Sequence, residues 1–129
     1  MTSSTATTRN IRVDVRAALL PDRSNPTDNE WFFAYEITIQ NLGADTVQLI
    51  SREWQISNAA GTVEIVRGPG VVGHQPTLKP REGFQYTSGC PLDSAFGSMK
   101  GTYHMVTADG ERFDVEIAEF ALVDPAAVN

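Results

Sequence analysis

The sequence predicts an all-β protein built as an antiparallel β-sandwich. Seven or eight short segments alternate apolar and polar residues with a period of two, which is typical of half-buried strands. Clusters of turn-forming residues separate these segments. The sequence contains no long amphipathic segment with the helical period of 3.6. With 129 residues, 41% of them hydrophobic, the chain has the size and composition of one domain with a sizeable core.

The first third of the chain predicts a tail, a strand, a loop and a second strand. Residues 1–9 are rich in Ser and Thr and have no large apolar residue after Met1, so we expect a disordered tail. Residues 11–19 and 31–41 alternate cleanly, and the polar, proline-containing stretch 21–29 connects them. The residues expected on the buried faces of these two strands are Ile11, Val13, Val15, Ala17, Leu19, Phe33, Tyr35, Ile37 and Ile39.

The third strand, predicted over 46–57, contains a change of parity. Val47 and Leu49 occupy odd positions, whereas Ile50 and Trp54 occupy even ones. Such a change indicates a β-bulge or a bend. The position of Trp54 resembles that of the buried tryptophan of immunoglobulin-like sandwiches.

Turn chemistry separates the later strands. We expect hairpin turns at 58–61 and 108–111, because Asn and Gly tolerate positive φ. The turn Gly89-Cys90-Pro91 is expected to end one strand, and a second bulge is expected near Ala118-Glu119. Residues 125–129 are predicted to be a loose tail, which leaves 10–124 as the domain. The strands themselves are expected at 62–66, 84–88, 99–107 and 113–122.

A glycine-dense stretch, residues 67–76, lies near the middle of the chain. It contains the pattern G-x-G-x-x-G at Gly68, Gly70 and Gly73. A dinucleotide-binding fingerprint requires a helix that starts at these glycines. Prolines within and directly after the motif, and the missing helical period downstream, exclude that interpretation.

Charge and cysteine content exclude several functional classes. The net charge of −6 opposes non-specific binding to nucleic acid or to acidic lipid. No apolar run is long enough to span a membrane, and no apolar segment follows the N-terminus as in a secretory signal. The single cysteine, Cys90, cannot form an internal disulfide, which is typical of a cytoplasmic protein.

Several motifs together resemble the bacterial ApaG family. The central one reads R-G-P-G-V-V-G-x-Q-P-x-L-x-P over 67–80 and continues as E-x-F-x-Y-x-S-G over 82–89. The segments F-A-Y-x-I-T-I-x-N at 33–41 and G-x-M-x-G-x-Y at 97–103 are also similar. The likeness covers residues 11–122, and Arg81 stands where the family usually has glycine.

This resemblance implies a fibronectin type III-like sandwich in a cytosolic protein. It implies an association with cobalt resistance and magnesium efflux, and no defined biochemical activity. It also implies a pyrophosphate-binding role for the glycine motif, which falls on Gly68, Gly70 and Gly73.

Two interpretations of the glycine-rich stretch stay open. It is either a tight connection that crosses between the two sheets or an anion site built from backbone N–H groups. The stretch between Glu64 and Glu82 contains no acid but several basic residues. The candidate anion-binding residues are therefore Arg67, Gly68, Gly70, Gly73, His74, Lys79 and Arg81.

Other reactive side chains do not form a recognisable catalytic or metal-binding pattern, so we expect no catalytic residue, metal or cofactor. His74 and His104 are the two histidines, and neither has a metal ligand at typical spacing. Asp22, Asp28 and Glu30 are expected to be a solvated loop. Cys90 is expected to be a small, partly buried residue, since a nucleophile needs a nearby base.

The sequence therefore predicts a binding or adaptor domain that is not an enzyme. We expect a protein partner, with a pyrophosphate-type anion as a further ligand, and no nucleic acid or membrane contact. Exposed edge strands would also allow a homodimer. The alternative is a sensor or hydrolase of phosphoanhydrides such as diadenosine polyphosphates, for which Glu82 and His74 are the nearest acid and base.

Overall fold

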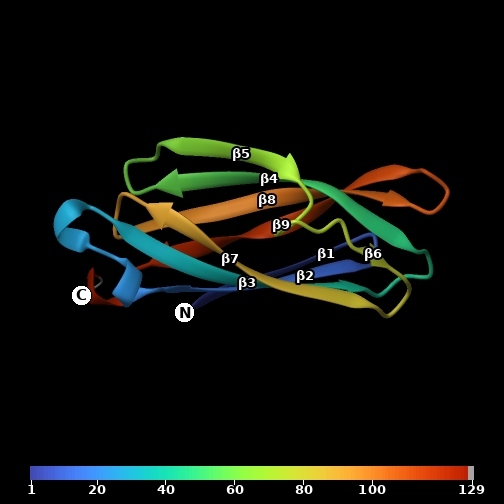
Figure 1. Ribbon diagram of the computed structural model, residues 1–129, viewed down its shortest axis with the longest axis horizontal. Coiled ribbons are helices and arrows are strands. Elements are labelled where there is room, and N and C mark those ends of the chain that lie inside the picture. The colour runs from blue at the N-terminus through green and yellow to red at the C-terminus, as the bar shows by residue number, and fades with distance from the viewer. Residues whose placement is uncertain (128–129) are drawn as a thin grey trace.

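A computed structural model describes residues 1–127 and confirms the antiparallel β-sandwich. The two sheets lie one above the other (Figure 1). One sheet has the strand order β1-β2-β3-β7, and the other has the order β5-β4-β8-β9, with the short β6 also paired to β4. The strands are β1 (Thr2–Thr8), β2 (Ile11–Leu19), β3 (Trp31–Asn41), β4 (Val47–Asn58), β5 (Val63–Pro69), β6 (Thr77–Leu78), β7 (Gly83–Leu92), β8 (Phe96–Thr107) and β9 (Arg112–Val123).

The described helices are three short 3₁₀ turns, none of them long or apolar enough to cross a membrane. Two of them, η1 (Pro21–Arg23) and η2 (Pro26–Asp28), lie in the predicted polar loop. The third, η3 (Pro125–Ala127), occupies most of the predicted C-terminal tail. The remainder of that tail, 128–129, lies outside the described residues.

The core is formed by the inward faces of both sheets, as the alternation predicted. Ile11, Val13 and Val15 of β2 and Ile37 and Ile39 of β3 are all buried. From the other sheet, Trp54 is only 2% exposed and packs edge-on against two rings, those of Tyr35 and Phe120. The prediction of a buried tryptophan in the third strand is confirmed.

Both predicted bulges are present. The pairing of β4 with β8 shifts register between Leu49 and Ser51, which leaves Ile50 as the extra residue. The pairing of β8 with β9 shifts between Met99 and Gly101, so that residues 118 and 119 lie opposite residue 100. Each bulge adds one residue to its strand. Apolar residues therefore face the core both before and after the point where they change from odd to even positions or the reverse.

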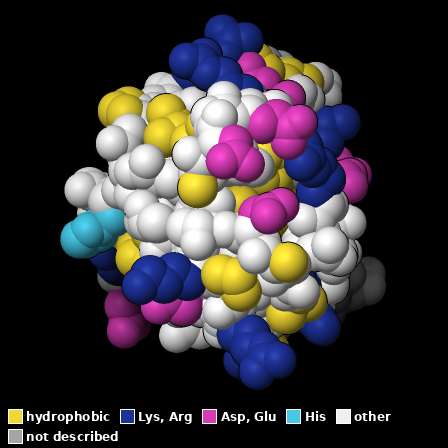
Figure 2. Space-filling model, turned by 90° about the vertical axis from the view of Figure 1, so that its right-hand side faces the viewer, with side chains coloured by type: hydrophobic (Ala, Val, Ile, Leu, Met, Phe, Trp, Pro, Cys, Tyr) yellow, Lys and Arg dark blue, Asp and Glu magenta, His cyan; other side chains and the backbone are white. Residues whose placement is uncertain are grey.

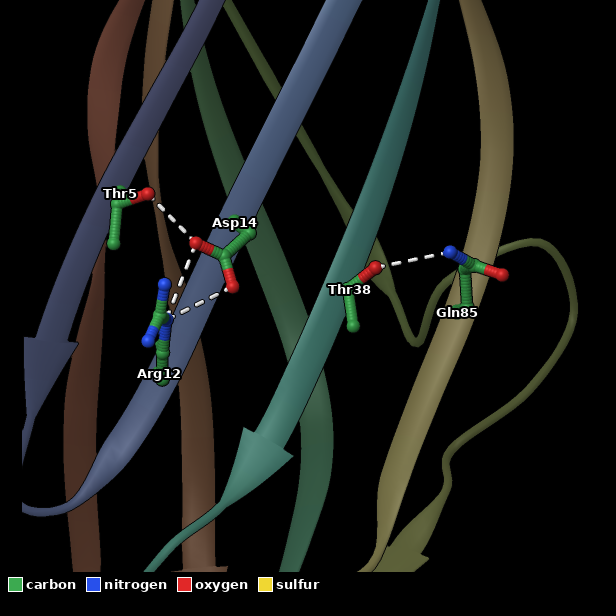
Figure 3. Close-up of polar contacts among 5 residues, drawn as sticks. All are labelled: Thr5, Arg12, Asp14, Thr38 and Gln85. Atoms are coloured by element: carbon green, nitrogen blue, oxygen red, sulfur yellow. Dashed lines mark hydrogen bonds and ion pairs between the residues drawn. The ribbon is translucent and has the colours of Figure 1, made fainter.

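The expected disorder of residues 1–9 is wrong. Thr2–Thr8 forms β1, which pairs with β2 along its whole length. Its Ser and Thr residues alternate between half-buried and exposed positions, so the strand gains stability from backbone pairing and hydroxyl contacts instead of apolar burial. Thr5 of β1 donates to Asp14 of β2, and Asp14 also accepts from Arg12 (Figure 3).

The expected turn at Gly89-Cys90-Pro91 is also wrong. β7 continues through this segment to Leu92, and Cys90 pairs with Phe33 of β3. Pro91 is tolerated because β7 is the last strand of its sheet order. No described strand lies on the outer side of β7 to accept a hydrogen bond from the N–H group that proline lacks.

The two lateral edges of the sandwich differ. On one side, β1 closes the gap to β9: Thr2 Oγ1 donates to the carbonyl of Ala121, and Ser4 Oγ donates to that of Ala118 at 2.8 Å. On the other side, β5 and β7 end their sheet orders. A cleft runs between these two strands, and we call this side the open edge.

Candidate functional site

The glycine-rich stretch lies on the open edge, between β5 and β6, which both pair with β4. Gly70 N–H donates to the carbonyl of Ile50 at 2.8 Å, and Leu49 N–H donates to the carbonyl of Pro76 at 3.0 Å. The stretch thus leaves β4 opposite the β4 bulge and returns to the same strand. The expected crossing between sheets occurs after it, at residues 79–82.

Packing explains two of the three motif glycines. A Cβ on Gly68 would stand 3.0 Å from Nη1 of Arg52, so this glycine makes room for the guanidinium group. A Cβ on Gly70 would stand 2.2 Å from the carbonyl oxygen of His74, and the φ of Gly70 is +58°. A side chain at Gly70 would therefore meet fixed backbone in a strained conformation, whereas one at Gly68 would meet only the end of the Arg52 side chain.

The tip of the stretch is a tight turn over residues 71–74. His74 N–H donates to the carbonyl of Val71 at 2.9 Å, and Val71 N–H returns a bond to His74 at 2.8 Å. Val72 and Gly73 have φ values of +43° and +84°, the positive φ at both central positions that a type I′ turn requires. Positive φ is rare for a β-branched residue such as Val72.

Backbone amides of this turn are used within the protein. The N–H groups of Gly70, Val71 and His74 all donate to backbone carbonyls, and the side chain of Val71 is fully buried. An anion site made of successive backbone amides needs free N–H groups, and these three already donate to carbonyls. The predicted anion binding at the motif stays a prediction, and the glycines have structural roles without it.

The predicted basic residues are not brought together. Arg67 lies on β5 opposite Glu53 of β4, and its Nε is 2.5 Å from the Glu53 carboxylate. Lys79 follows Leu78, which pairs with Val47 of β4. Val47 and Glu53 are six residues apart along this strand, so the two positions are separated by about 20 Å. Figure 2 shows basic and acidic side chains interspersed over the end of the molecule at the right of Figure 1.

The turn at 79–82 carries its own acid. The carboxylate of Glu82 accepts the N–H of Lys79 at 2.8 Å. Arg81 adopts φ +74°, which explains why glycine is the usual residue there in the family that the sequence resembles.

The remaining predicted reactive residues lie apart. His74 packs near Phe84, with 5.8 Å between ring centroids, whereas His104 bonds Asp114 through Nδ1 at 2.9 Å. Cys90 is buried, and its burial raises the pKa of the thiol to about 11. Within residues 1–127, no three His, Cys, Asp or Glu residues gather in a group that could hold a metal ion.

Sequence reasoning missed a polar cleft at the open edge. Arg52 and Trp54 lie two residues apart after the β4 bulge, so both side chains point between the sheets. There Nη1 of Arg52 donates to the carbonyls of Pro69 and Gly70 at 2.9 and 2.8 Å. The spacing of Arg52 from an inward tryptophan is the signal that could have revealed it. Tyr35, Tyr86 and Ser88 line the same cleft, whose volume is about 320 Å³.

The cleft continues into a larger hollow of about 590 Å³ along the same edge. Ile56, Glu64 and Pro91 line both parts. The larger part also contains Trp31 and Arg23, and the Arg23 guanidinium lies 4.6 Å from the ring centre of Phe32.

The two tyrosines of the smaller cleft, and the buried Tyr103 beside them, keep their protons. Burial raises the pKa of Tyr35, Tyr86 and Tyr103 above the ordinary value, and the nearby positive charge of Arg52 only partly offsets this. Tyr86 and Tyr103 also share a hydrogen bond of 2.5 Å between their hydroxyl groups. At neutral pH these groups are therefore neutral hydrogen-bond donors and acceptors.

The chain is similar over most of its length to known proteins. The sequence profile of the ApaG domain matches residues 21–107. Protein ApaG of Rhodospirillum centenum is 52% identical over 118 residues, 92% of this chain and 91% of the relative, and that of Mesorhizobium japonicum is 53% identical over 117 residues, 91% and 90%. A crystal structure of the ApaA protein of Bordetella pertussis superposes with a TM-score of 0.88 at 45% identity, covering 92% of this chain and 97% of that one. The C-terminal domain of Wzt, with a TM-score of 0.55 at 8% identity, shares the fold alone.

Proposed function

The chain belongs to the ApaG family, and we propose that it is a non-enzymatic binding module that contacts a protein partner through its open edge. The unequal closure of the sandwich supports this most directly. β1 seals one lateral side by contacts with β9, whereas β5 ends its sheet without such a cover from any of residues 1–127. An unpaired edge strand is a ready surface for another chain.

The outer face of β5 has the composition of a contact surface. Val63 and Ile65 are 53% and 45% exposed, and Arg67 follows them with the same parity. Arginine is enriched at protein interfaces, and a partner would also remove the two exposed aliphatic side chains from water. The family's association with cobalt resistance and magnesium efflux would then be an indirect effect of the partner.

Affinity capture followed by direct binding tests this proposal. The wild-type protein should retain a defined partner from lysate, and the purified partner should bind it directly. Ile65→Asp and Arg67→Glu should each weaken that binding by about tenfold or more. Arg112→Glu is the matched control, because Arg112 is exposed on β9 and the same charge change there should leave binding within about twofold.

Two outcomes would overturn the proposal. One is that the purified protein retains no protein partner and binds only small anions. The other is turnover of a diadenosine polyphosphate by the purified protein with Mg²⁺ or Co²⁺, since this would make the chain a hydrolase of phosphoanhydrides. Such turnover should be absent.

A further inference from the structure

We propose that the smaller cleft at the open edge binds a small organic monocarboxylate, with Arg52 holding the carboxylate group. This inference requires no protein partner and therefore stands apart from the adaptor role. It is carried by the charge of Arg52, by the hydrogen-bond donors around it and by the apolar walls of the cleft.

Arg52 carries a positive charge without a carboxylate partner among the described residues. The neighbouring acid on β4, Glu53, has the opposite parity and pairs with Arg67 instead. Arg52 is half-buried, and two backbone carbonyls fix its Nη1 at 2.8 and 2.9 Å. A guanidinium that is held in place and partly removed from water has a strong preference for an anion, which it binds in a bidentate manner.

Neutral donors complete the polar part of the cleft. Tyr35, Tyr86 and Ser88 supply hydroxyl groups from β3 and β7. Trp54 also lines the cleft, and within the described part of the chain its Nε1–H is buried without an acceptor.

The remaining walls select the kind of anion. Val66, Val71 and Met99 give the cleft an apolar side that suits a hydrocarbon body. Glu64 also lines the cleft, and its negative charge opposes a ligand with more than one charge. A single arginine facing neutral donors and an acid at the rim therefore fits a monocarboxylate better than pyrophosphate.

The two tryptophans allow a direct test by NMR. The Trp54 side chain lines the cleft, whereas the indole N–H of Trp31 is bonded to Asp124 at 3.0 Å and serves as an internal reference. In a titration with benzoate at neutral pH, the Trp54 signal should shift and saturate while the Trp31 signal stays. Benzamide, which has the same body without the charge, should bind at least about tenfold more weakly, and pyrophosphate should not move the Trp54 signal.

Variants separate a specific site from general charge attraction. Arg52→Gln should weaken benzoate binding by about tenfold or more, whereas Arg67→Gln removes the same charge from the outer face of β5 and should change it less than about twofold. Since Arg52→Gln could also release the glycine-rich stretch, Tyr86→Phe provides a second test that keeps all charges, and it should weaken binding severalfold. The proposal is overturned if benzoate leaves Trp54 unshifted, if benzamide or pyrophosphate binds as well as benzoate, or if folded Arg52→Gln and Tyr86→Phe bind like the wild type.

Discussion

Arg52 lies against Gly68, close enough that a Cβ on the glycine would stand 3.0 Å from the guanidinium Nη1. The same nitrogen bonds the carbonyls of Pro69 and Gly70. One arginine on β4 thus connects the cleft to the glycine-rich stretch, and its guanidinium group packs against the first glycine of the motif.

The first prediction compares alanine substitutions at two motif glycines. Gly70→Ala should destabilise the protein by about 3 kcal/mol or more, because the new Cβ would meet a backbone carbonyl at 2.2 Å and φ is positive. Gly68→Ala should cost no more than about 1 kcal/mol, because the atoms it meets belong to a flexible side chain. Chemical denaturation measures both free energies of unfolding, and equal losses would contradict this account.

A second prediction concerns Val72 at the tip of the turn. Val72→Asn should raise the free energy of unfolding by about 1 kcal/mol, because asparagine tolerates positive φ and precedes glycine in type I′ turns. Val72 is 50% exposed, so little apolar burial is lost. Val63→Asn is the matched control: Val63 is similarly exposed but extended in β5, and its replacement should give no gain.

The third prediction concerns β1. Removal of residues 1–8 should lower the free energy of unfolding by several kcal/mol, because β2 would lose its partner and become an edge. Ser4→Ala isolates one contact with β9, the 2.8 Å bond to the carbonyl of Ala118, and should cost about 1 kcal/mol. Full stability of the truncated protein would show that β1 adds nothing to the sandwich.

The alternation of apolar residues predicted most of the fold, because inward positions such as Ile37 and Val115 must avoid water. It could not predict β1, whose Ser and Thr residues contact β9 through hydroxyl groups and leave no apolar pattern. Strand pairing also changes the surroundings of Arg67. Along the chain no acid lies between Glu64 and Glu82, but the pairing of β4 with β5 places Glu53 directly across from Arg67.

The candidate cleft was the least predictable feature. Its residues come from strands far apart in sequence, and Tyr35 and Tyr86 are indistinguishable from ordinary core residues by parity alone. Arg52 follows the β4 bulge, so its direction depends on where the extra residue lies. Trp54 follows the same bulge two residues later and is buried, and this spacing is the signal that Arg52 faces the interior.

The last prediction is a loss of stability at alkaline pH through Cys90. In the unfolded chain the thiol loses its proton near pH 9, whereas burial in the folded protein raises its pKa to about 11. Between these values the unfolded state binds fewer protons than the folded state, so the free energy of unfolding falls as pH rises, by about 2–3 kcal/mol over the whole window.

The variant Cys90→Ala separates the contribution of the thiol to this loss of stability from the contribution of the buried tyrosines. The raised pKa values of Tyr35, Tyr86 and Tyr103 have the same sign, but their contribution begins near pH 10, where unfolded tyrosine ionises. In Cys90→Ala the decline between pH 9 and 10 should disappear, although the cavity lowers stability at every pH. The decline above pH 10 should remain, because the tyrosines are unchanged. A wild-type stability that stays constant from pH 9 to 10 would mean that the thiol ionises as readily in the folded protein as in the unfolded chain.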